Sequence, residues 1–179
     1  MYPMSELFLV RVPVWIALMA WFLGSTARLL SRERHGRAPD VIRNKSSWER
    51  WYRWSWLFSG VMFWLHILAS YGVVHGWDHA AALQQTAEES YEVTGIRASW
   101  GVYVNFVFAA LVLVYPAVML QQNRRIEAID VLVFLFLSSI VFSATIVFEN
   151  GFLRIVSLIG FLVLVLIGTA TARNLRRTH

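Results

Sequence analysis

Three residues in one short stretch have the types and the spacing of metal ligands. His75, Asp78 and His79 stand at positions i, i+3 and i+4, which share one face if a helix continues through them. Two imidazoles and a carboxylate resemble a facial metal triad with open positions, and copper or zinc would suit the imidazoles. The structural alternative is that Gly76 ends a helix and Asp78 caps the next one, which leaves both histidines as ordinary interfacial residues.

His66 is the second candidate, because it lies inside an apolar segment where an ionisable side chain is costly. Together with Asn105 and Ser143 it is predicted to form a polar layer, either as a haem ligand, quinone partner or proton relay, or as a neutral imidazole hydrogen-bonded between helices. A b-type haem usually takes axial ligands from two helices. The membrane and outer-side histidines here follow one another on a single span, so haem b would need a methionine, a partner subunit or a second copy.

Five apolar segments position these candidates. The chain of 179 residues is 58% hydrophobic, with a mean hydropathy of +0.53. Since ~20 helical residues cross the hydrocarbon core of a bilayer, the predicted spans are about 7–30, 54–74, 99–120, 129–148 and 152–172. Backbone groups in lipid must be satisfied internally, which favours helices. We therefore predict an all-α integral membrane bundle, a single domain over 1–179, with a surface helix at about 79–92 on its outer side.

The basic residues predict the orientation of this bundle. The segment from Arg28 to Arg53 holds eight Lys and Arg, Arg124 and Arg125 add two, and the tail after Ala172 adds three, so that 13 of 16 lie on one side. The positive-inside rule places that side in the cytoplasm, with the N-terminus outside, as in a bacterial inner-membrane protein. The net charge of +5 then reflects orientation, and no nucleic-acid partner is expected.

Local patterns add three expectations. Ser46 and Glu49 have the spacing of a capping box, which predicts a helix start near Ser46. Trp51 and Arg53 belong to an aromatic and basic stretch that is either an interfacial belt or a site for anionic lipid or a partner. Gly168 and Ala172 are small and four residues apart, a spacing that permits close packing of helices. The lack of Cys excludes a disulfide, a thiolate metal site, an iron–sulfur cluster held by this chain and covalent c-type haem.

Three stretches resemble a group of uncharacterised bacterial multi-span inner-membrane proteins. These are His75-Gly-Trp-Asp-His-Ala-Ala-Ala-Leu, Gly101-Val-Tyr-Val-Asn-Phe and Ala144-Thr-Ile-Val-Phe-Glu. The resemblance covers about the last four helices. It implies a multi-span fold and no known activity.

The expected function is that of a non-catalytic subunit of a larger inner-membrane complex, such as an electron-transfer complex. Its expected partners are the lipid bilayer and other membrane subunits or further copies of itself. One alternative is a redox or metal-binding protein that uses His66 or the group His75, Asp78 and His79. A second alternative is a small oligomeric transporter or channel. The acidic outer loop is predicted to mark the functional face, with a cation or a basic partner as its ligand.

Overall fold

The computed structural model describes residues 4–35, 47–122, 127–149 and 151–176. Those residues form helices and short connections, with no strand among them. In chain order the elements are α1 (Met4–His35), α2 (Ser47–Ala69), the π-helix η1 (Ser70–Val74), α3 (His79–Thr94), α4 (Gly101–Gln122), α5 (Glu127–Phe142), the π-helix η2 (Ser143–Val147) and α6 (Phe152–Arg176).

Five helical segments of the described chain are long and apolar enough to cross a membrane, which confirms the predicted all-α membrane bundle. They are Phe8–Ser31, Ser47–Val74, Gly101–Gln121, Ala128–Val147 and Phe152–Asn174. The second begins earlier than the predicted residue 54, because α2 runs without a break from the aromatic and basic stretch into the apolar stretch. Helix α3 covers the residues predicted as a surface helix, about 79–92, and extends to Thr94.

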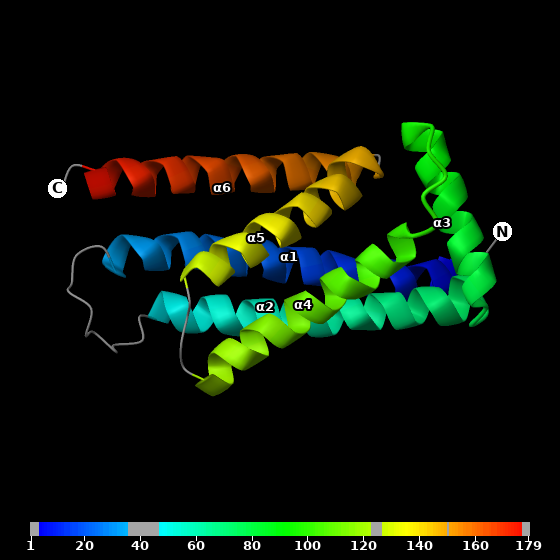
Figure 1. The fold of residues 1–179 in the computed structure, drawn as a ribbon, viewed down its shortest axis with the longest axis horizontal. Helices are drawn as coiled ribbons and strands as arrows, with labels where there is room; N and C mark the ends of the chain where they lie inside the picture. Colours follow the sequence, from blue (N-terminus) through cyan, green and yellow to red (C-terminus); the bar gives the residue numbers. More distant parts are fainter. Residues whose placement is uncertain (1–3, 36–46, 123–126, 150, 177–179) are drawn as a thin grey trace.

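The helices run between two ends of the molecule (Figure 1). We call one the α3 end, because α3 lies across the bundle there, beside the start of α1. We call the other the basic end, where α1 and α6 finish and α2 and α5 begin. Helix α1 packs mainly against α2 and α6, and α2 packs in turn against α4. Helix α5 crosses between α4 and α6, and η2 contacts α6.

A close approach between two helix backbones depends on Gly60. A Cβ atom added there would lie 2.7 Å from the Cα of Leu113, so α2 and α4 meet backbone to backbone. At Gly168, by contrast, an added Cβ would lie 3.9 Å from the side chain of Leu29, an ordinary contact. The small-residue contact in this bundle therefore joins α2 to α4, and Gly168 does not bring α6 against another backbone.

Three aromatic rings form the centre of the core. Trp21 of α1, Trp56 of α2 and Phe134 of α5 lie nearly parallel, with ring centroids 6.2–6.4 Å apart. Both tryptophans are fully buried. Rings of this size contribute large apolar areas, and stacked pairs add stabilisation beyond area alone. The three rings thus pack α1, α2 and α5 against one another in the core.

A buried ion pair closes the bundle near the basic end. The Asp130 carboxylate accepts hydrogen bonds from Arg28 Nε at 2.8 Å, from Tyr52 Oη at 2.6 Å and from Tyr115 Oη at 3.1 Å, and Arg28 Nη2 lies 2.6 Å from Asp130 Oδ2. We call these four residues the Asp130 hub. They come from α1, α2, α4 and α5, so one carboxylate ties four helices together. The guanidinium of Arg28 also lies 4.1 Å above the Phe134 ring.

The start of α2 lies next to the predicted capping box of Ser46 and Glu49. Ser46 lies outside the described residues, and α2 begins at Ser47. Glu49 is buried, and its Oε1 accepts a hydrogen bond from Arg53 Nε at 3.0 Å. The carboxylate thus pairs with an arginine one turn further along the same helix.

Candidate functional site

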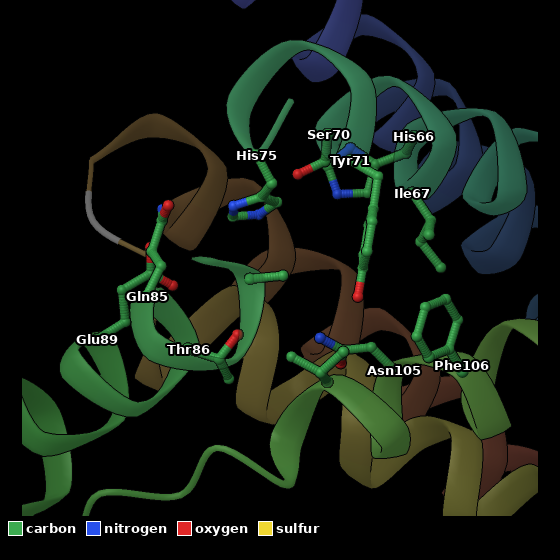
Figure 2. A pocket seen from close by; sticks show the side chains of 12 residues that line it. His66, Ile67, Ser70, Tyr71, His75, Gln85, Thr86, Glu89, Asn105 and Phe106 are labelled. Atoms are coloured by element: carbon green, nitrogen blue, oxygen red, sulfur yellow. The ribbon is translucent and has the colours of Figure 1, made fainter. Parts of the chain in front are cut away.

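A cavity of about 230 Å³ opens at the α3 end, between α2, α3 and α4. Figure 2 shows its wall, to which α3 contributes one side. The lining residues are His66 and Ile67 of α2, Ser70 and Tyr71 of η1, His75 after it, Ala82, Gln85, Thr86 and Glu89 of α3, and Val102, Asn105 and Phe106 of α4. Two of the predicted candidates, His66 and His75, therefore meet in one pocket.

A π-helical turn shapes one wall of this pocket. In η1 the His75 N–H donates to the Ser70 carbonyl at 3.3 Å, five residues back, so the turn is wider than an α-turn. Such turns within α-helices are frequent at functional sites. The turn carries Ser70 and Tyr71 into the wall, and neither residue was predicted from the sequence to belong to a site. The available signal was a pair of adjacent polar residues near the end of an apolar span.

The helix does not continue through the predicted metal triad. Gly76 and Trp77 have φ values of +55° and +65°, in the left-handed region that ends a helix. Asp78 instead caps α3, because its Oδ1 accepts a hydrogen bond from the Ala80 N–H at 2.8 Å. This is the structural alternative that the sequence left open.

The triad hypothesis therefore loses the helical geometry on which it depended. His75 lines the pocket, whereas the His79 ring contacts two tyrosines. Within the described ranges, no three His, Asp or Glu side chains are grouped so that they could hold a metal ion.

His66 is held by a hydrogen bond to another helix, as expected for a polar ring inside an apolar span. Its Nδ1 lies 2.8 Å from the carbonyl oxygen of Val10 in α1. A carbonyl can only accept, so Nδ1 carries the hydrogen, and in the neutral imidazole Nε2 is left as an acceptor. Figure 2 shows the His66 ring at the pocket wall, beside Tyr71.

The predicted polar layer forms in part. Asn105 lines the same pocket as His66. Ser143, at the start of η2, is not one of the lining residues. The layer therefore joins α2 to α4 and does not extend to the α5 segment.

His79 fastens α3 over the bundle. Its Nδ1 lies 3.1 Å from Tyr71 Oη, and its Nε2 lies 3.2 Å from Tyr103 Oη. The ring thus joins the first turn of α3 to η1 and to α4. Further along α3, Ala82 is almost fully buried. These contacts hold the α3 side of the pocket against the transmembrane helices.

The pocket is rich in hydrogen-bond acceptors and carries a negative charge. Among the described lining residues, Glu89 alone is a carboxylate, and its Oε1 accepts a hydrogen bond from Gln85 Nε2 at 2.8 Å. Glu88 and Glu92 are exposed on the same helix. Arg97, the nearest basic residue in sequence, stacks over the Tyr91 ring at 5.1 Å. A negative surface of this kind attracts cations.

Comparisons with protein-family models, curated proteins and solved structures find no match to this chain.

Proposed function

We propose that this protein is a non-catalytic subunit of a bacterial inner-membrane complex and that it binds a small organic cation in the pocket at the α3 end. The observation that carries the proposal is that His66 of α2 and Glu89 of α3 line one pocket from opposite sides (Figure 2). The hydrogen bond to Val10 fixes the His66 ring so that Nε2 is an acceptor, and Glu89 supplies the negative charge. A protonated amine complements both groups.

The remaining wall suits the same ligand. Tyr71 and Phe106 present aromatic rings, which attract cations through their π faces. Among the described residues, acidic side chains and imidazoles are not grouped as metal ligands, which favours an organic cation over a metal ion in this pocket. The cavity volume is below the ~300–1,000 Å³ of pockets that hold drug-sized ligands, so the proposed cation is a small one.

The surface of α6 leaves a face on which a neighbouring subunit could pack. Within the described part of this helix, Ser157, Leu164 and Thr171 are buried, at intervals of seven residues, and α6 packs on α1. Most of its large apolar side chains are exposed, including Ile155, Leu162 and Leu166. That face suits either lipid or a neighbouring transmembrane subunit.

A haem b at His66 fits the pocket poorly. The Nδ1–H bond to a backbone carbonyl is the orientation common to metal-ligating histidines. However, a haem is larger than most drug-sized ligands, and the volume of this cavity is already below that of pockets for drug-sized ligands. We therefore propose no haem chemistry for this pocket.

The test is amine binding to the protein purified in mild detergent. Phenethylamine and cadaverine are titrated while binding is followed by calorimetry, with 2-phenylethanol as the uncharged counterpart. Glu89→Gln removes the charge from the wall, and Glu92→Gln makes the same change on the same helix at a position that does not line the pocket. We expect Glu89→Gln to weaken amine binding at least tenfold, since hydrogen bonds to charged groups contribute ~1.5–3 kcal/mol, and Glu92→Gln to change it less than twofold.

Two results would contradict the cation site. The first is that neither amine binds, and the second is that the two glutamine variants weaken amine binding equally. The subunit role is tested separately by the native mass of the complex extracted from membranes. A mass equal to that of a single chain would refute it, and a Soret band in the visible spectrum would instead favour the haem alternative.

A further inference from the structure

A second cavity, of about 220 Å³, lies at the opposite end of the bundle, between the start of α2 and the end of α4. Its lining residues are Glu49, Arg50, Arg53, Trp54 and Leu120. Nothing in the proposed function uses this cavity. Two arginines and a tryptophan line it together, which is the chemistry of an anion site at a membrane surface.

The two arginines play different parts. Arg53 is buried, donates through Nε to Glu49 at 3.0 Å and through Nη1 to the Met119 carbonyl at 2.8 Å, and so connects α2 to α4. Arg50 is exposed, and it forms no ion pair with any residue that the structure describes. Since Glu49 neutralises Arg53, the lining carries one net positive charge, provided by Arg50. That charge complements a monoanionic ligand.

Exposed tryptophans place the cavity at the depth of lipid headgroups. Trp48, Trp51 and Trp54 are all exposed in the first turns of α2, with Trp51 64% and Trp54 59% accessible. Tryptophan is enriched at the boundary between headgroups and hydrocarbon, because its ring is apolar and its N–H is polar. Basic pockets between transmembrane helices at this level typically hold anionic headgroups.

An apolar stripe continues from the cavity along α2. Phe58, Val61, Leu65 and Leu68 are exposed on the same helical face as Trp54, at spacings of three and four residues. A ligand with a headgroup in the cavity would therefore have a surface for an acyl chain directly beside it. A free phosphate or an acidic protein segment would make no use of this stripe.

We propose that this cavity binds the headgroup of one anionic phospholipid, with its phosphate at Arg50, its glycerol against Trp54 and an acyl chain along the stripe from Phe58 to Leu68. Arg53, held by Glu49 and Met119, shapes the floor of the site. The headgroup thereby lies between the start of α2 and the end of α4.

The experiment is native mass spectrometry of the detergent-purified chain titrated with phosphatidylglycerol or with phosphatidylcholine of the same acyl composition. Arg50→Gln removes the unpaired charge, and Arg173→Gln makes the same change at an exposed position of α6 toward the same end of the bundle, outside the cavity. Trp54→Leu is compared with Trp51→Leu, which alters an equally exposed tryptophan of the same helix that does not line the cavity. Thermal unfolding without added lipid checks that each variant folds.

We expect the wild type to retain one phosphatidylglycerol and to bind it about fivefold more tightly than phosphatidylcholine, the ratio that corresponds to one basic side chain near an anionic surface. Arg50→Gln is expected to abolish this preference, and Trp54→Leu to weaken both lipids. Arg173→Gln and Trp51→Leu are expected to leave binding unchanged, and Arg50→Lys to retain the preference.

Three outcomes would overturn the proposal. The first is that phosphatidylcholine binds as tightly as phosphatidylglycerol, and the second is that Arg50→Gln binds lipid like Arg173→Gln. The third is that inorganic phosphate at equal concentration displaces the lipid. The last result would assign the cavity to small anions in place of phospholipid.

Discussion

Replacing Asp130 by asparagine should destabilise the bundle strongly, because it leaves the buried Arg28 without its counter-charge. Arg28 is 1% exposed and Asp130 is fully buried. Nε and Nη2 of Arg28 lie 2.8 and 2.6 Å from one carboxylate oxygen, and Tyr52 donates to the other at 2.6 Å. Removing one partner of a buried ion pair costs about 3–5 kcal/mol, since the remaining charge stays desolvated.

The measurement is reversible unfolding in mixed micelles with increasing sodium dodecyl sulfate, followed by the fluorescence of the buried tryptophans. Asp130→Asn is compared with Glu149→Gln, which removes an exposed carboxylate beyond the other end of the same helical segment. The double variant Arg28→Met, Asp130→Leu removes both charges and should recover part of the lost stability, because apolar residues of similar size often replace a buried pair without loss. The recovery is incomplete, since Tyr52 and Tyr115 lose the carboxylate as acceptor. Tyr52→Phe should cost about 1.5–3 kcal/mol, as expected for a hydrogen bond to a charged group.

The buried ion pair contributes no stability if Asp130→Asn and Glu149→Gln unfold at the same detergent fraction. An unpaired charge is likewise excluded as the cause if the double variant is no more stable than Asp130→Asn alone, because the loss would then reflect packing.

Three further predictions test other parts of the molecule. Gly60→Ala should lower the free energy of unfolding by about 1–3 kcal/mol, because the added Cβ would meet the backbone of Leu113 at 2.7 Å. Gly168→Ala should be tolerated in the same unfolding assay, and equal effects of the two changes would show that α2 and α4 can separate at no cost. Asp78→Ala should lower the local stability of α3 by about 1 kcal/mol, which is measured as faster amide hydrogen exchange in its first turn. Asp78→Asn can still cap the helix and should exchange at the wild-type rate, so equally fast exchange in the two variants would exclude the capping role. A reporter fused after His179 should be active only in the cytoplasm, as the positive-inside rule predicts, and activity outside the cell membrane would reverse the orientation.

The spans and the surface helix were predictable because each depends on properties that are local in sequence. An apolar run of sufficient length forms a helix in lipid whatever its neighbours are, because its backbone groups have no other partners. Both ends of α3 also carry local signals. Asp78 caps its first turn, and Gly95 ends it in the left-handed conformation at φ +75°.

The tertiary structure decided which polar groups meet, because that depends on which helix faces pack together. Asp130 lies 102 residues from Arg28, and it was overlooked at the start of the fourth span, since hydropathy sums do not reveal a partner. His66 was singled out, but its partner Val10, 56 residues away, is a backbone carbonyl that no side-chain pattern encodes. The proposed triad failed for a related reason: whether a helix passes through Gly76 and Trp77 depends on the left-handed conformation of both residues, which a non-glycine residue such as Trp77 seldom adopts.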